Sequence, residues 1–387
     1  MKASALLELM LKVAEKASLI AKIIRKEKPL VDLLIEEKSG LEKNSRFFQD
    51  FKTLADVLIQ ETVRHYISQQ VPEMGSSIYG EESNKFTNVV GDTVVVEICD
   101  TCDQTQELLK TVLNGHDEAA RLLAEAVHCH LNNICLTTDA DLSVDIDTSD
   151  CGIWIDPIDS TGQYIKGKKG KLSECGLVED GLQCVAILIG LFQKSTGKPI
   201  LGVAVQPFAE FHKETNSWKS ITIWGICYNG VKTTSLQAAE PSAQGRGKVL
   251  LSSSESEHVK TALATKFDLV FASGAGYKML ATALGLVNAY VLSHRTVYRW
   301  DCCAVHAILL ALGGGIVSYK HALEALSQSE DPLTEDHLTK LQVQYTRAGG
   351  TISNRRASIC GGTESLPGIV AYRSIPDVVA VLELLRE

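Results

Sequence analysis

Positive charge is scarce in this sequence. Among 387 residues, Lys and Arg number 38 against 47 Asp and Glu, which leaves a formal net charge of −9. A surface that coats nucleic acid needs a basic stripe, so this balance argues against a nucleic-acid partner. An anionic small substrate stays open, because bound metal ions can invert the field of an acidic site.

Long apolar runs are missing too. Nowhere does the chain reach the length of continuous apolar sequence that a membrane helix requires, so we expect no membrane partner. Residues 1–28 alternate apolar and charged side chains at helical spacing and lack a signal-peptide pattern. These two features predict a cytoplasmic protein.

The 11 cysteines form no recognisable framework. One CxxC occurs, at Cys99 and Cys102, but no second one completes a four-cysteine zinc site. The pattern favours reduced thiols, which agrees with a cytoplasmic location. The acidic stretch 132–151 lacks the central glycine and the terminal glutamate of an EF-hand loop, so we interpret it as a solvated loop.

What remains is an ordinary soluble composition, with 45% hydrophobic and 22% charged residues. The length exceeds one ordinary core, which favours a bilobal molecule or two domains. Helical periodicity predicts helices over 3–27, 55–70 and 103–131, the last with a break near Asn114. A short strand is expected at 77–79.

From residue 182 the pattern becomes that of an antiparallel meander, and from about 248 strands alternate with helices, as in an α/β layer. The meander strands are predicted at 182–192, 199–205, 208–212 and 218–228. The later strands are predicted at 249–251, 268–271, 289–292, 316–317 and 368–373. Their helices are predicted to start near 256, 275, 301 and 376. Residues 321–366 are polar and turn-rich, which predicts a peripheral excursion.

The segment 153–161 carries the strongest chemical signal. An apolar strand is predicted to end at Asp156, where Pro157 stops it, and Asp159 follows three residues later. Two carboxylates and the intervening Ile158 carbonyl suit Mg²⁺, which prefers oxygen ligands. Ser160 and Thr161 open a predicted helix whose amides would point at a phosphate. Alone, the same residues could form only a turn and a helix cap.

Two distant features favour the metal site over the turn. Paired carboxylates, Glu81 and Glu82, follow a predicted strand, and Asp301 opens a predicted apolar helix. Each could be a simple surface turn or helix cap. Carboxylates at three separate places, each at the end of a predicted strand or helix, favour a metal site over three unrelated turns or caps.

At these residues the sequence resembles the lithium-sensitive inositol monophosphatase superfamily. Its pattern is GEE or GEES, then D-P-[IL]-D-[GS]-[ST], then W-D near the start of a late helix, and all three occur here in order. The match spans nearly the whole chain. Ser160, where most members have Gly, and the run 159–167 resemble a branch that acts on inositol polyphosphates. So do the runs 50–56, 181–184 and 274–278. The chain departs from that branch in the loop 168–180 and in 321–366.

The resemblance implies a layered α/β/α/β/α sandwich of the inositol monophosphatase and fructose-1,6-bisphosphatase type. We predict an N-terminal part, 1–245, that holds the antiparallel sheet and most metal ligands. The C-terminal part, 246–387, would hold substrate contacts and Asp301. The implied reaction is removal of the 1-phosphate of inositol 1,4-bisphosphate and inositol 1,3,4-trisphosphate by a monomer, inhibited by Li⁺ and Ca²⁺.

The resemblance also implies roles for single residues. Two or three Mg²⁺ ions would be held by Asp56, Glu81, Glu82, Asp156, Ile158, Asp159 and Asp301. Metal coordination would make a water molecule nucleophilic. Thr161, hydrogen-bonded to Asp56, would orient that water, with Glu81 also in the catalytic set. Substrate would contact Asp159, Ser160, Thr161, Ser252, Ser254, Gly274, Ala275 and Lys278. Lys278 would pair with the second phosphate, and amides of the glycine-rich 274–276 turn would approach the ligand.

Two other readings stay open. A 3′(2′),5′-bisphosphate nucleotidase of the same superfamily would share every metal ligand, and Ser160 with the run to Gly167 argues against it. A non-catalytic inositol phosphate-binding protein would have lost a metal carboxylate, and none is lost here.

Overall fold

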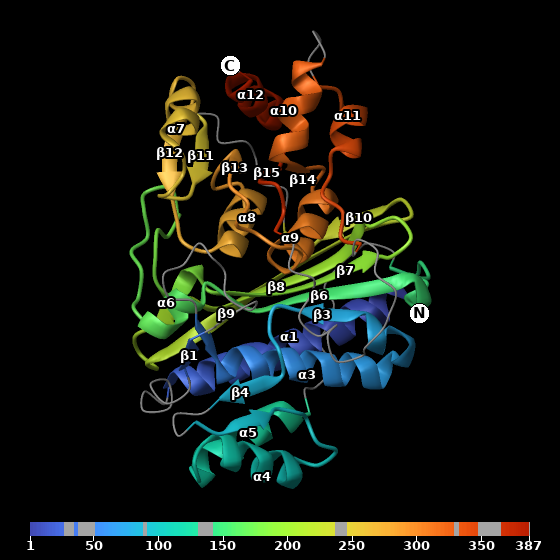
Figure 1. The fold of residues 1–387 in the computed structure, drawn as a ribbon, viewed down its shortest axis with the longest axis vertical. Coiled ribbons are helices and arrows are strands. Elements are labelled where there is room, and N and C mark those ends of the chain that lie inside the picture. Colours follow the sequence, from blue (N-terminus) through green and yellow to red (C-terminus); the bar gives the residue numbers. More distant parts are fainter. Residues whose placement is uncertain are drawn as a thin grey trace.

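The structure, a computed structural model, describes residues 1–26, 35–37, 51–87, 91–130, 142–236, 246–328, 333–346 and 365–386. Helices and sheets alternate in layers along its long axis (Figure 1). The α-helices are α1 (Ala3–Lys26), α3 (Leu54–Gln70), α4 (Cys102–Val112), α5 (Asp117–His128), α6 (Thr161–Lys166), α7 (Glu257–Ala264), α8 (Ala275–Ala283), α9 (Arg299–Ala311), α10 (Tyr319–Ser327), α11 (Glu335–Lys340) and α12 (Ile375–Leu385). Short 3₁₀ turns are η2 (Pro72–Ser77), η3 (Thr148–Asp150) and η4 (Leu182–Cys184).

The larger sheet has six strands in the order β10-β9-β8-β7-β6-β3 and is antiparallel except for the β3–β6 pair. Its strands are β3 (Ile78–Gly80), β6 (Cys151–Asp159), β7 (Ala186–Gln193), β8 (Pro199–His212), β9 (Ser217–Tyr228) and β10 (Val231–Thr234). The predicted meander is confirmed. The two strands expected over 199–212 are one strand, because the irregularity between Gln206 and Glu210 bends β8 without ending it.

The smaller sheet has five strands in the order β12-β11-β13-β15-β14. They are β11 (Lys248–Leu251), β12 (Asp268–Phe271), β13 (Ala289–Leu292), β14 (Gly315–Ser318) and β15 (Ile369–Tyr372). β11 runs parallel to both neighbours, whereas β15 inserts antiparallel between β13 and β14. Two small hairpin-like pairs, β1 (Ile35–Glu37) with β2 (Phe51–Thr53) and β4 (Lys85–Thr87) with β5 (Thr93–Val95), lie outside both sheets.

The layers follow the order that the family resemblance implies. α1 and α3 cover one face of the six-stranded sheet, α8 and α9 lie between the sheets, and α7, α10 and α12 cover the outer face of the five-stranded sheet (Figure 1). Separate apolar clusters fill the spaces between these layers. No helix among the described residues is long and apolar enough to cross a membrane.

A row of glycines brings α9 close to the six-stranded sheet. Gly190, Gly202 and Gly225 are cross-strand neighbours on β7, β8 and β9. A Cβ on Gly190 would lie 2.5 Å from Ala304 N, and one on Gly225 would lie 2.7 Å from Ile308 Cα. The missing side chains therefore set the depth of α9, and with it the position of Asp301 near its start.

Several predicted boundaries need correction. α9 begins at Arg299, and the Asp301 carboxylate accepts the Tyr298 amide at 2.6 Å as a cap. The excursion over 321–366 is not only turns and is not wholly peripheral. Its described residues form most of α10 and all of α11. It also buries Tyr345 completely, with the Tyr345 carbonyl accepting Trp154 Nε1 at 3.0 Å. Of the acidic stretch 132–151, residues 132–141 lie outside the described residues, while Asp147 caps η3 through Ser149 N.

Candidate active site

Three of the predicted ligands meet where β6 and α9 come together. Ligand atoms of Asp156, Asp159 and Asp301 all lie within 4.8 Å of one another. β6 does not stop at Asp156 as predicted but continues to Asp159, with a register shift between the two residues. Pro157 has no N–H for the sheet ladder, so it sits in this bulge and lets both carboxylates leave the same strand.

Burial and like charge make this cluster costly without a cation. Burial raises the pKa of Asp156 well above its usual value, and the charges of Glu81, Asp159, Asp301 and Asp56 raise it further. Burial also raises the pKa of Asp159 to about 6, against the lowering effect of the Tyr277 amide and of Lys278. Like charges held this close favour either protons or a divalent cation.

The residues present fit a divalent metal ion. Asp156 Oδ1 is buried and has no hydrogen-bond partner among the described residues. A buried carboxylate oxygen in that state is costly unless a cation completes it. All three clustered side chains offer hard oxygen ligands, the type that Mg²⁺ prefers.

The paired glutamates follow β3 as predicted. The Glu81 amide donates to Ile155 O at 3.2 Å, which places this turn beside β6. Glu82 is buried, and its backbone is held by Gln60 of α3. Glu81 and Glu82 are not part of the 4.8 Å cluster, although the charge of Glu81 reaches Asp156.

The predicted catalytic pair is only partly in place. The Asp56 Oδ2 atom accepts from both the amide and the hydroxyl of Thr53, each at 2.6 Å, in the capping box that begins α3. The Thr161 hydroxyl donates to Ile158 O at 3.1 Å. The hydrogen bond between Thr161 and Asp56 therefore stays a prediction. Ser160, which precedes α6, has φ 73°, in the left-handed region.

On the proposed substrate side, two of the predicted residues contact each other. Lys278 is buried, and its ammonium donates to Ser252 Oγ at 2.8 Å and lies 4.9 Å from the centre of the Tyr290 ring. The chain thus places Lys278 and Ser252 together, while Ser254 is exposed.

One amide within the predicted 274–276 turn and one just after it bind Asp159. Ala275 N donates to Asp159 Oδ1 at 3.2 Å, and Tyr277 N donates to Asp159 Oδ2 at 3.3 Å. Gly274, with φ 80°, permits this approach, since a Cβ there would lie 2.8 Å from Asp159 Oδ2. The glycine-rich turn therefore orients a predicted metal ligand.

Sequence reasoning missed two side chains. Gln60 braces the Glu82 backbone and lies four residues after Asp56, a spacing that places both on one face of α3. Tyr290 lies under the Lys278 ammonium, and nothing in the local sequence marks it apart from an ordinary buried strand residue.

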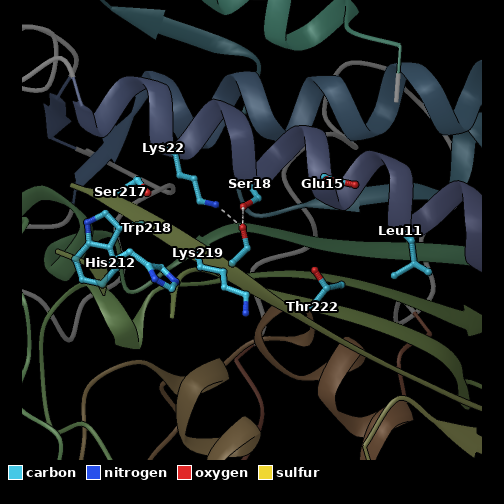
Figure 2. A pocket seen from close by; sticks show the side chains of 10 residues that line it. Leu11, Glu15, Ser18, Lys22, His212, Ser217, Trp218, Lys219 and Thr222 are labelled. Carbon is cyan, nitrogen blue, oxygen red and sulfur yellow. Dashed lines mark hydrogen bonds between the residues drawn. The ribbon is translucent and has the colours of Figure 1, made fainter. Parts of the chain in front are cut away.

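A separate cavity of about 560 Å³ lies between α1 and the β8–β9 hairpin (Figure 2). Ser18 and Ser220 share a hydrogen bond of 2.9 Å across it, and Lys22 donates to Ser220 Oγ. Burial lowers the pKa of Lys22, with Glu15 opposing. No predicted site residue is among the ten that line this cavity, so it is distinct from the carboxylate cluster.

Comparison with known proteins gives the class. The sequence profile described as the inositol monophosphatase family matches residues 6–348. The chain therefore belongs to the inositol monophosphatase family. Within that family it is 42% identical to inositol polyphosphate 1-phosphatase of Mus musculus, over 95% of this chain and 93% of that protein. It is 40% identical to the Homo sapiens protein of the same name, over 99% and 97% of the two chains.

A solved structure supports the fold alone. The extragenic suppressor protein suhB from Bartonella henselae matches with a TM-score of 0.52 and 12% sequence identity, and the alignment covers 99% of each chain. The layered architecture is therefore shared with that protein.

Proposed function

We propose that this protein is an inositol polyphosphate 1-phosphatase. It removes the 1-phosphate of inositol 1,4-bisphosphate and inositol 1,3,4-trisphosphate with Mg²⁺, and Li⁺ and Ca²⁺ inhibit it. The observation that carries the proposal is the cluster of Asp156, Asp159 and Asp301 within 4.8 Å, in a chain that is 40% identical to Homo sapiens inositol polyphosphate 1-phosphatase over 99% of its length.

Two or three Mg²⁺ ions would be held by carboxylates and one carbonyl, from Asp56, Glu81, Glu82, Asp156, Ile158, Asp159 and Asp301. Mg²⁺, when bound, supplies positive charge beside the phosphate and lowers the pKa of a coordinated water. The amides of Ala275 and Tyr277 hold the Asp159 carboxylate in one orientation, which keeps it ready as a ligand.

The chain's own groups orient the reactants. Thr161 lies at the first turn of α6, where its hydroxyl donates to Ile158 O. In the reaction this hydroxyl would instead donate to Asp56 and accept a hydrogen bond from the attacking water. Lys278 has its ammonium buried on Ser252 and Tyr290, so it would present a fixed positive charge to the second phosphate. Ser160, Ser254, Gly274 and Ala275 complete the proposed substrate contacts.

The direct test is phosphate release from inositol 1,4-bisphosphate with Mg²⁺ and graded Li⁺. We expect Mg²⁺-dependent release that falls as Li⁺ rises. The Asp156→Asn variant should lose turnover while its circular dichroism spectrum stays that of the wild type. Full activity in a large excess of Li⁺ would remove the lithium part of the proposal.

Two alternatives are decided by the same assay. Faster turnover of adenosine 3′,5′-bisphosphate than of inositol 1,4-bisphosphate would make the protein a bisphosphate nucleotidase. No Mg²⁺-dependent release from either compound would leave a non-catalytic inositol phosphate-binding protein. We also propose a cytoplasmic monomer, which light scattering and cell fractionation would test.

A further inference from the structure

Gln60 is a fully buried side chain of α3 that grips one residue of the glutamate turn by both backbone groups. Its Nε2 donates to Glu82 O at 2.6 Å, and its Oε1 accepts from Glu82 N at 2.9 Å. This is the pairing that a neighbouring β-strand would supply. Together the two hydrogen bonds hold the Glu82 backbone against α3.

The glycine of the Gly-Glu-Glu-Ser motif makes room for this contact. A Cβ on Gly80 would overlap Gln60 Oε1. The φ of Gly80 is not in the positive range that favours glycine. The missing side chain of Gly80 therefore allows the approach of Gln60 and does not serve a backbone turn.

The same helix carries other parts of the site. Asp56, Gln60 and Arg64 follow one another at four-residue intervals on one face of α3. Asp56 lies in the first turn of this helix, and Arg64 Nη1 donates to Ile78 O at 2.6 Å at the start of β3. One rigid element therefore sets the spacing between Asp56 and the glutamate turn.

We propose that Gln60 is a positioning residue that holds Glu81 and Glu82 at the divalent-metal site. The inference rests on the metal site of the proposed function. Both hydrogen bonds from Gln60 to the turn are made with backbone atoms of Glu82, so the effect passes through the backbone of the turn. Removing outer partners of metal ligands typically weakens metal affinity by about 10- to 100-fold, and we expect a loss of about 10-fold here.

The test measures metal binding directly. Mn²⁺, which shares the oxygen preference of Mg²⁺, is titrated into wild type and Gln60→Met, and free Mn²⁺ is read by electron paramagnetic resonance. Met has nearly the volume of Gln, but its thioether has no N–H to donate to Glu82 O and is only a weak acceptor for Glu82 N. The matched control is Gln342→Met, because Gln342 also accepts a backbone amide, Ile316 N at 2.9 Å, and donates to a carbonyl, Leu338 O at 3.2 Å. Gln342 braces β14 and α11, which carry no predicted ligand, and its hydrogen bond to α9 is made with the His306 side chain, not with the backbone of Asp301.

Gly80→Ala supplies a second variant, because it displaces Gln60 without removing it. We expect Gln60→Met and Gly80→Ala each to weaken Mn²⁺ binding about 10-fold, the double variant to lose little more, and Gln342→Met to bind like wild type. Wild-type Mn²⁺ affinity in folded Gln60→Met, or in folded Gly80→Ala, would overturn the inference. If wild type releases no phosphate yet Gln60→Met loses Mn²⁺ affinity, the proposed function fails and the positioning role stands.

Discussion

At the scale of single residues, the carboxylate cluster links metal, protons and stability. The pKa of Asp159 is about 6 in the folded chain, raised by burial above the usual value for aspartate, and that of Asp156 is raised in the same direction. The folded state therefore holds these protons more tightly than the unfolded state does. The stabilisation of the folded state by these bound protons is complete below the ordinary aspartate pKa. It is lost as pH rises through the pKa that the carboxyl has in the folded state.

We predict that the metal-free protein loses thermal stability as pH rises from about 4 to about 7, and that Asp159→Asn has a shallower loss. The melting temperature in a chelator, measured across this range for both proteins, checks it. Mg²⁺ should reverse the trend, because it binds the ionised carboxylates. Parallel pH profiles for wild type and Asp159→Asn would contradict the assignment to Asp159.

At Ser160, backbone strain in the folded state and chain entropy in the unfolded state have opposite effects on the choice between serine and glycine. Its φ of 73° costs an L-residue about 1–2 kcal/mol, whereas glycine avoids this cost but loses about 0.5–1 kcal/mol through its more flexible unfolded chain. We predict that Ser160→Gly raises the free energy of unfolding by about 0.5–1 kcal/mol. Urea denaturation measures it.

The control for that experiment is Ser160→Ala, which keeps the strained backbone and removes only the hydroxyl. It should be less stable than Ser160→Gly. Both should alter the KM for inositol 1,4-bisphosphate if the hydroxyl contacts substrate. Equal stability of the two variants would mean that the backbone strain at this position is no larger than the entropic cost of glycine.

At the scale of elements, the depth of α9 on the glycine row decides where Asp301 lies. We predict that Gly202→Ala lowers stability by about 1–3 kcal/mol through overpacking, because its new Cβ would meet the α9 backbone at Ala304. Mg²⁺-dependent phosphate release should fall as well. Denaturation and the phosphatase assay measure the two effects.

Gly75→Ala is the matched control, because its Cβ would meet only the Ser68 side chain, at 3.3 Å, which can shift. It should change neither stability nor activity by a comparable amount. If Gly202→Ala is destabilised but keeps full activity, the position of Asp301 does not depend on the depth of α9.

Element types were predictable from sequence because burial imposes periodicity. The meander, the later strand–helix alternation and α1 all follow from apolar spacing, and they are confirmed. Three features were not predictable. Pro157 forms a bulge because β7 still pairs with Asp159, Tyr345 is buried by long-range contact with Trp154, and the amides of α8 bind Asp159. Each depends on a partner distant in the sequence.

At the scale of the molecule, the two predicted parts share one apolar cluster. Residues 1–245 contain the six-stranded sheet and residues 246–387 the five-stranded sheet, yet one apolar cluster joins Trp154 and Leu188 of the first to Tyr290 and Ile308 of the second. The division at residue 245 therefore marks a change of sheet within a common core.

We predict that the whole chain unfolds in a single transition, because neither sheet can lose α9 without exposing the shared cluster. Calorimetry would show one peak whose calorimetric and van't Hoff enthalpies agree. Two resolved peaks would instead make 1–245 and 246–387 separate cooperative units.

The place of β15 has a consequence for synthesis of the protein. β13 and β14 are adjacent in sequence but not in the sheet, because β15 lies between them and pairs with both. On the ribosome, residues 341–343 can pair with the strand at 315–318 first, but that strand joins the five-stranded sheet only after residues 369–372 have emerged. Asp301 lies on the helix between β13 and β14, so the last predicted metal ligand is secured only when translation of this region is nearly complete.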